Sequence, residues 1–269
     1  MQLSIVSASR APLRAEKSGA SEMTSELIFG EAVEVLDKDN TWLKVRNLYD
    51  NYTGWADIRL FEPINGYTPQ DLLTGKLGIN LILPVYRLDP NYGMKVQILG
   101  INAFFPDTLL STQDEDSLKY QFGEIEFFVG KDLIETPKAF ERDNLLEMAE
   151  WFLNVPYYWG GRSSCGIDCS GLLQQVFRAC GNSLPRDAKD QALTGKKIKF
   201  DEIKAGDIAF FSNSDGNIVH TGICTGENEI IHASGFVKTD ELRPDGIYDQ
   251  QLGKITHVLA HINTYFTDC

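Results

Sequence analysis

Three side chains in the second half of the chain have the types needed to cleave an amide bond. Cys169 lies within the segment GIDCSGLLQQVF, and His220 and His232 follow further along the chain. A cysteine thiolate is a strong nucleophile, and a neighbouring imidazole can take up its proton and pass it to the leaving group. A second imidazole can hold the far nitrogen of the first ring. These residue types therefore predict nucleophilic catalysis by a cysteine.

The predicted position of Cys169 favours reactivity. The apolar spacing after it predicts a helix that begins near Cys169 and ends at Gly181. Backbone N–H groups at a helix start lack partners and the helix dipole adds positive potential, so both favour a thiolate near neutral pH and can stabilise an oxyanion. Gly160, Gly161 and Gly166 precede it and would let a substrate backbone approach closely.

The two histidines are predicted to face each other across a hairpin. Gly226, with Glu227 and Asn228 beside it, lies between two strand-like segments that carry His220 and His232. A hairpin centred on Gly226 places the two histidines directly opposite each other. Their even separation also places both on one face of the sheet. One ring can then contact the thiol while the other orients it.

A structural zinc site is the alternative use of these residues. Cys165 and Cys169 have the short spacing of cysteine zinc ligands. His220 and His232, however, are separated by eleven residues rather than the three to five that are usual in such sites. We therefore expect no metal and no other cofactor.

The remaining cysteines and histidines are predicted to be structural. Cys180 and Cys224 lie in apolar segments, where free cysteines are commonly buried and inert. His257 and His261 also lie on an apolar strand, and Cys269 has no predicted partner.

The elements after Pro137 predict an α+β domain over residues 140–269. A first helix is expected where Asn144 and Glu147 form a capping-box pattern, and Pro156 should end it. The helix that begins at Cys169 comes next. Four strand-like segments follow the helices: GDIAFFS (206–212), HTGICTG (220–226), EIIHASG (229–235) and THVLAHIN (256–263).

The first half of the chain reads as short strands separated by turns, which predicts small β-barrels. We expect one over residues 1–65 and a second over residues 75–136, with a linker rich in Pro, Gly, Asn and Thr between them. The segments that carry this prediction are EAVEVLD, WLKVRNL and TGWADI in the first barrel, and INLILPVYRL, KVQILGINAFF and YQFGEIEFFVG in the second.

The amino-acid composition limits the classes of binding partner and the compartment that we expect for this protein. A formal net charge of −13 and a pI of about 4.8 argue against non-specific binding to nucleic acid or to an anionic membrane. No window approaches a membrane span, and the first 30 residues contain no signal-like apolar stretch. Five cysteines without regular spacing favour reduced thiols, so we expect a cytoplasmic protein. The alternative is the cell envelope, if a leader has been removed.

Residues 145–261 resemble the NlpC-type cell-wall cysteine peptidases, which are relatives of papain. The resemblance is carried by the DCSG box, the LPRDA segment, GDIAFF and the two histidine segments, which occur in the family's order. It implies a papain-like fold with Cys169 as nucleophile, His220 as general base and then acid, and His232 as the residue that orients His220.

The same resemblance implies a substrate-binding set. Tyr157 and Trp159 match the aromatic pair that borders the cleft, whereas Asp168, Ser170 and Asp187 match positions that help to bind substrate. An acidic peptide also needs a local cation. Arg162 and Arg186 are the candidates for holding its carboxylate.

The N-terminal region resembles bacterial SH3-like domains, two of which would precede the catalytic domain. In one subgroup of these peptidases the first such domain holds the free amine of an L-alanine end. Tyr52 matches the tyrosine of that site, and Glu22 is our choice for the acid, with Glu26 as the alternative.

The resemblance implies hydrolysis of the bond between γ-D-glutamate and a diamino acid in murein-derived tri- and tetrapeptides with a free N-terminal L-alanine. Such peptides are recycled in the cytoplasm. Whether the diamino acid is lysine or meso-diaminopimelate, and the oligomeric state, stay open. An amidase or acyltransferase on the same scaffold is one alternative, and a non-catalytic cell-wall-binding protein is the other.

Overall fold

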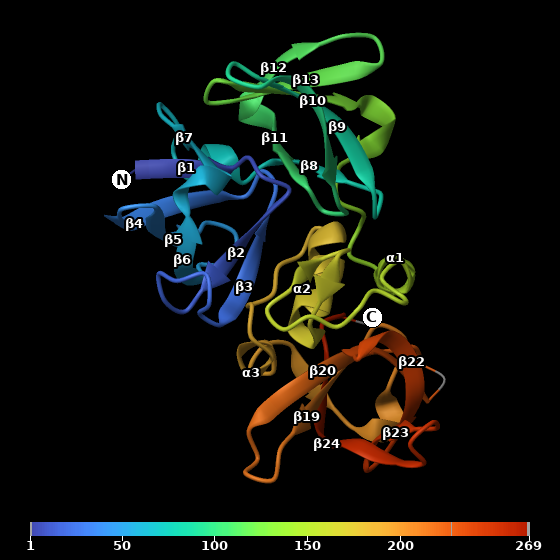
Figure 1. Cartoon of the computed structure of the whole chain (residues 1–269). Helices are drawn as coiled ribbons and strands as arrows, with labels where there is room; N and C mark the ends of the chain where they lie inside the picture. The colour runs from blue at the N-terminus through green and yellow to red at the C-terminus, as the bar shows by residue number, and fades with distance from the viewer. Residues whose placement is uncertain (1, 227, 268–269) are drawn as a thin grey trace. The chain divides into compact units, whose positions relative to one another are not determined.

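The computed structural model describes residues 2–226 and 228–267, so Cys269 and Glu227 lie outside the described residues. The chain forms two compact units (Figure 1). Unit 1 comprises Met1–Pro137 together with Arg162–Ser164, and unit 2 comprises Lys138–Gly161 together with Cys165–Cys269.

The first part of unit 1 is a seven-stranded sheet in the order β3-β2-β6-β5-β4-β1-β7. Alternating apolar residues on these strands face one core, which includes Leu13, Val33 and Val45. Its strands are β1 (Gln2–Val6), β2 (Arg10–Arg14), β3 (Met23–Ile28), β4 (Ala32–Asp39), β5 (Trp42–Asn47), β6 (Thr53–Asp57) and β7 (Phe61–Ile64), with short 3-10 helices at Ile58–Leu60 and Gln70–Leu72.

The second part of unit 1 contains a five-stranded sheet, β10-β9-β14-β13-β12, and a three-stranded sheet, β11-β8-β15. Its strands are β8 (Gly75–Gly78), β9 (Leu83–Asp89), β10 (Gly93–Leu99), β11 (Phe104–Pro106), β12 (Leu110–Gln113), β13 (Ser117–Phe122), β14 (Ile125–Gly130) and β15 (Ile134–Glu135), with 3-10 helices at Asp107–Leu109 and Lys131–Leu133.

A single core connects the two parts of unit 1. Phe29, from the first part, packs against Phe105, Phe122 and Phe127 of the second with ring centroids 4.8–5.3 Å apart. The residues predicted to form two SH3-like domains therefore share buried surface within one unit. The division at residues 65 and 75 stays a prediction.

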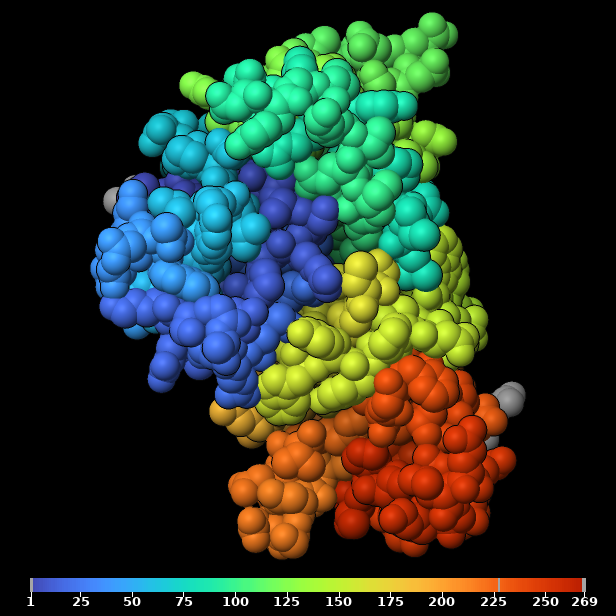
Figure 2. All heavy atoms as spheres, in the orientation of Figure 1, coloured from blue at the N-terminus to red at the C-terminus, as the bar shows by residue number. Residues whose placement is uncertain are grey.

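Unit 2 is built on a sheet whose ends meet. Its strand order is β18-β24-β19-β20-β21-β22-β23, and β23 pairs back onto β24, so six of the strands close into a barrel. The space-filling view shows these residues, coloured orange to red, as one compact body (Figure 2). Its strands are β18 (Lys196–Ile198), β19 (Ile208–Ser212), β20 (Ile218–Cys224), β21 (Glu229–Ser234), β22 (Phe236–Arg243), β23 (Gly246–Asp249) and β24 (Lys254–Thr264).

Helix α2 packs against strands β20 and β21 of this barrel, and α1 packs against α2 (Figure 1). All eleven residues of α2 are buried, so the helix is a central element of unit 2. The helices are α1 (Arg142–Glu150), α2 (Cys169–Ala179) and α3 (Ala188–Gln191), with a 3-10 helix at Phe200–Glu202 and two-residue strands β16 (Arg162–Ser163) and β17 (Gly166–Ile167).

The predicted start of the first helix is wrong. Helix α1 begins at Arg142 with Glu141 as its N-cap, and that cap makes no side-chain hydrogen bond. Asn144 lies inside the helix, and its side-chain amide donates to the carbonyl of Ala139, 3.0 Å away, rather than capping the helix. The helix also ends at Glu150, before Pro156. Among the described residues, no helix combines the length and the apolar character needed to cross a membrane.

Candidate active site

Cys169 occupies the first position of α2, as predicted. The carboxylate of Asp168 caps this helix by accepting a hydrogen bond from the backbone N–H of Gly171 at 2.7 Å. The sulfur of Cys169 accepts hydrogen bonds from the backbone N–H groups of Thr221 and Ser170. Thr221 is the neighbour of His220 on β20, so the thiol lies beside the strand that carries the predicted base.

Burial of Cys169 acts against the predicted thiolate. Cys169 is only 7% exposed, and burial raises the pKa of its thiol to about 12, with the negative charge of Asp168 adding to the increase. The N–H groups of Thr221 and Ser170 and the charge of Arg186 act in the opposite direction but are outweighed. Burial therefore favours the neutral thiol in the free protein, a cost that the helix-start argument omitted.

His220 and His232 are brought together, as predicted. The Nε2 atom of His220 lies 2.8 Å from the Nδ1 atom of His232, and both rings are buried. The predicted register is nevertheless wrong, because Gly222 rather than His220 lies opposite His232. The strand ladder ends with Cys224 opposite Ile230, whereas a hairpin centred on Gly226 would pair Cys224 with Asn228. The rings meet diagonally because both stay on one face of the sheet.

His257 adds a third imidazole that the sequence reading assigned to a structural role. Its ring stacks on His220 with centroids 4.0 Å apart and an interplanar angle of 25°. Burial, followed by the charges that His257 and His232 would carry, holds the pKa of His220 well below its usual value. Burial likewise lowers the pKa of His257 to about 4. His220 is therefore a neutral ring that can accept a proton.

Asp240 on β22 was also missed. Its Oδ2 atom lies 3.0 Å from Nε2 of His232, and the same oxygen pairs with Nζ of Lys238 at 2.8 Å. Lys238 lies opposite His232 across the β21–β22 ladder. The even spacing of residues 232, 238 and 240 about the turn at Gly235 is a signal that could have placed all three side chains on one face.

Two predicted substrate-binding residues form a network at the start of α2. Arg186 binds both carboxylate oxygens of Asp168 at 2.6 and 3.1 Å, and it donates to the hydroxyl of Ser170 at 2.8 Å. The backbone N–H of Gly160 donates to the same carboxylate at 2.9 Å. This network fixes the loop before the thiol and places a guanidinium near it.

The other predicted substrate-binding residues of unit 2 lie on its surface. Tyr157 is half-buried, and its pKa is raised by burial and by the charges that Cys169 and Asp168 would carry, which places it near the thiol. Trp159 is 60% exposed. Asp187 is the N-cap of α3, and burial raises the pKa of its half-buried carboxyl.

The predicted amine-binding residues belong to unit 1. Tyr52 packs against the core of the first sheet, and Glu22 is exposed at the start of β3. The carboxylate of Glu26 is buried and accepts hydrogen bonds from Arg10 at 3.2 Å and from the backbone N–H of Arg162 at 3.1 Å. The role of Tyr52 and of either glutamate in amine binding stays a prediction.

Arg162 cannot serve as the predicted cation for a substrate. Its side chain is fully buried, and its two terminal nitrogens each lie 3.0 Å from a carboxylate oxygen of Glu31. A guanidinium held in this way is used for packing and ion pairing within unit 1. Arg186 is also nearly buried and is paired with Asp168, so the same argument applies to it.

Metal-ligand atoms converge in the described part of the chain at His220, His232 and His257, whose nitrogens lie within 4.8 Å of one another. Neither Cys165 nor Cys169 belongs to this group, so the zinc set suggested by the cysteine spacing is not assembled there. Cys165 is exposed, whereas Cys180 and Cys224 are buried as predicted. Burial raises the pKa of the Cys180 thiol to about 11.

Comparison with known proteins gives the family. The sequence profile of the NlpC/P60 family matches residues 154–256, and that of the bacterial dipeptidyl-peptidase Sh3 domain matches residues 13–58. A probable endopeptidase NlpC from Escherichia coli is 36% identical over 107 residues, which cover 39% of this chain and 69% of that protein. The chain belongs to the NlpC/P60 family.

Other NlpC/P60 relatives match most of the chain. The gamma-D-glutamyl-L-lysine dipeptidyl-peptidase of Bacillus subtilis is 28% identical over 257 residues, which cover 85% of this chain and 78% of that protein. The crystal structure of an NlpC/P60 family protein from Bacillus cereus ATCC 10987 matches with a TM-score of 0.80, covering 98% of this chain and 99% of that one. At 18% identity this second match shows the fold. The predicted papain-like domain with an N-terminal SH3-like region is confirmed, and the protein is an NlpC/P60 cysteine peptidase.

Proposed function

We propose that this NlpC/P60 peptidase hydrolyses the bond between γ-D-glutamate and a diamino acid in short murein peptides with a free N-terminal L-alanine. The proposal is carried by one observation, the buried His220–His232 pair next to a thiol at the start of α2. It is supported by the similarity to the Bacillus subtilis relative, a gamma-D-glutamyl-L-lysine dipeptidyl-peptidase.

The first step is attack by a thiol that is neutral at rest. Nε2 of His220 is engaged by His232, which leaves Nδ1 to accept the proton of the Cys169 thiol as the sulfur attacks the γ-amide carbonyl. Proton transfer must accompany attack because the thiol is not ionised beforehand. Backbone N–H groups at the start of α2 stabilise the oxyanion that forms on the carbonyl oxygen.

The second half of the reaction restores the enzyme. The protonated His220 gives its proton to the amine of the diamino acid, which leaves as the carbon–nitrogen bond breaks and a thioester remains on Cys169. A water molecule then attacks the thioester, His220 takes a proton from that water, and the sulfur departs with a proton returned by His220. The released product is L-Ala-D-Glu.

Substrate selection would depend on charged groups. Arg186 is nearly buried and already binds Asp168 and Ser170, so it would act on the α-carboxylate of γ-D-glutamate through its charge at the start of α2 rather than through a direct contact. Tyr52 and Glu22, with Glu26 as the alternative acid, would hold the free amine. We place the activity in the recycling of wall peptides in the cytoplasm, a reducing compartment that suits the free thiols of Cys165, Cys169, Cys180 and Cys224.

The proposal is tested with a matched pair of peptides, L-Ala-γ-D-Glu-L-Lys and the same peptide acetylated at its amine. We expect release of lysine from the first by the natural protein, and none by the Cys169→Ala variant. The acetylated peptide should be cleaved far more slowly. Equal cleavage of both would overturn amine recognition, whereas turnover by Cys169→Ala would overturn the chemistry itself.

A further inference from the structure

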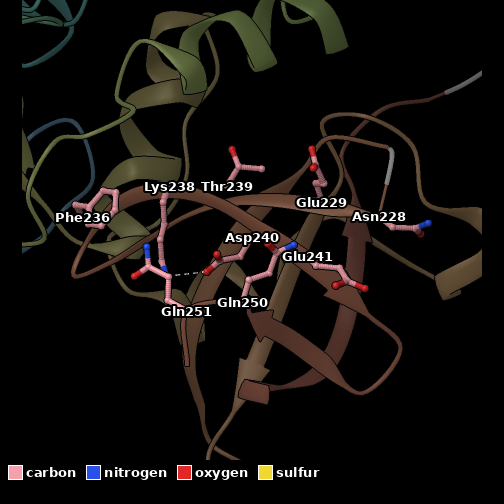
Figure 3. A pocket seen from close by; sticks show the side chains of 9 residues that line it. All are labelled: Asn228, Glu229, Phe236, Lys238, Thr239, Asp240, Glu241, Gln250 and Gln251. Carbon is pink, nitrogen blue, oxygen red and sulfur yellow. Dashed lines mark ion pairs between the residues drawn. The ribbon is translucent and has the colours of Figure 1, made fainter. Parts of the chain in front are cut away.

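The relay of hydrogen bonds that begins at His220 does not end at His232. The Nε2 atom of His232 lies 3.0 Å from Oδ2 of Asp240, and the same oxygen of Asp240 lies 2.8 Å from Nζ of Lys238. Figure 3 shows Lys238 and Asp240 joined by this ion pair, on the side of β22 that lines an open pocket of about 620 Å³. Four side chains therefore lie in sequence, from the predicted base to a surface-facing ion pair.

The carboxylate at the end of this relay dictates where every proton lies. An ionised carboxylate only accepts hydrogen bonds, so Nε2 of His232 must carry the hydrogen that Asp240 receives. A neutral ring has only one N–H, so Nδ1 of His232 must be an acceptor. Nε2 of His220 must then donate to it across 2.8 Å. The remaining nitrogen of His220, Nδ1, is left without a proton.

We propose that Asp240 is a positioning residue that fixes the tautomers of His232 and His220 and so keeps Nδ1 of His220 free to act as the base. The inference rests on the proposed function and adds to it a residue that acts through two others. It matters in this protein because the thiol is neutral at rest. A ring with its proton on Nδ1 could not deprotonate Cys169.

The surroundings of Asp240 keep it ionised. Burial opposes ionisation, but hydrogen bonds and charges from His232 and Lys238 outweigh it, so the pKa of Asp240 is lowered. Lys238 is itself held by a second partner, Asp249 on β23, at 2.8 Å. His257 on β24 also interacts with Asp240, and its pKa is lowered to about 4, so it stays neutral near pH 7.

Asp240→Ala tests the proposal by removing the acceptor. Two readouts are measured on the full chain: kcat and KM with L-Ala-γ-D-Glu-L-Lys, and the side-chain nitrogen NMR signals of histidines labelled with nitrogen-15, which distinguish Nδ1–H from Nε2–H rings. We expect kcat to fall by about tenfold to a hundredfold, the range for loss of one hydrogen bond to a charged group, with KM little changed. We also expect His232 and His220 to lose their single Nε2–H tautomer.

Two further variants control for a purely structural effect. Asp240→Asn keeps an oxygen that can accept from His232, so it should retain the tautomer and lie between the natural protein and Asp240→Ala in kcat. Glu241→Gln removes a carboxylate from the next position of β22, where Glu241 pairs only locally with Arg243, and should change neither readout.

The outcomes separate this inference from the proposed function. A fall in kcat with unchanged tautomers would overturn the positioning role, as would natural tautomers and natural kcat in Asp240→Ala. The NMR readout needs no substrate. If the peptide is not a substrate but the tautomers shift as expected, the proposed function fails and the role of Asp240 stands.

Discussion

Nε2 of His220 and Nδ1 of His232 lie 2.8 Å apart inside a closed barrel, and this contact sets the direction in which the base can act. Because one nitrogen of His220 is engaged, only the other can reach a thiol. His232→Ala should therefore lower kcat by up to about a hundredfold, because His220 loses the contact that orients it as general base. His232→Gln keeps an amide oxygen as acceptor and should lose less. Steady-state kinetics check both, and equal kcat for all three proteins would contradict the account.

The reactivity of Cys169 should report a neutral thiol. Burial raises its pKa to about 12, so alkylation by iodoacetamide should be slow near pH 7 and should accelerate as the pH rises. Mass spectrometry of the peptide that contains Cys169 separates it from the exposed Cys165. A rate that is already maximal and flat between about pH 5 and pH 8 would reveal a preformed thiolate–imidazolium pair and contradict this reading.

The acid limb of the pH–rate profile should lie below the usual histidine range. The pKa of His220 is lowered by burial and then by His257 and His232, so the base stays neutral down to pH values well under 6.5. His257→Asn removes one of those two charges and should move the acid limb of kcat/KM upward. A limb that stays in place in the variant would show that His257 does not act on His220.

Folding stability should also depend on these rings. The pKa of His257 falls from 6.5 to about 4 on folding. Between these pH values the unfolded chain therefore binds a proton at His257 that the folded protein does not bind. Stability is therefore complete above about pH 6.5 and declines as the pH falls towards 4. The melting temperature should drop less in His257→Asn than in the natural protein between pH 7 and pH 5. An equal fall in melting temperature in the two proteins would show that His257 does not cause the pH dependence of stability.

Two aspartate–arginine pairs, one buried and one exposed, allow the effect of burial on folding stability to be compared. Asp168 caps α2 and binds Arg186, and both side chains are nearly buried. Asp168→Asn keeps the cap but leaves the guanidinium without its charge partner, which should cost about 3 kcal/mol of unfolding free energy. Asp57 likewise caps a short helix and binds the exposed Arg59, so Asp57→Asn should cost under about 1 kcal/mol. Urea unfolding measures both, and similar costs would contradict the argument from burial.

The sequence predicted what depends on local pattern. The start of α2 at Cys169 follows from the apolar spacing after it, and the shared face of His220 and His232 follows from an even separation. What it missed depends on distant parts of the chain. His257 reaches His220 only because β23 pairs with β24 and closes the barrel, and the ionisation of Cys169 depends on how completely the fold buries it.

The register error has the same origin. Cys224 pairs with Ile230 instead of Asn228, so each opposing pair moves by two positions, and the local sequence around Gly226 does not specify the length of the turn. The face is preserved because the shift is even, so the prediction of contact survived the error in register.

The most direct measurement is rapid acid quenching of the enzyme during turnover of L-Ala-γ-D-Glu-L-Lys, followed by mass spectrometry of its cysteine peptides. The account predicts a mass increase equal to the L-Ala-D-Glu acyl group on the peptide that contains Cys169, and none on peptides with the other cysteines. Continued turnover with the acyl group absent from Cys169, or present on another residue, would contradict it.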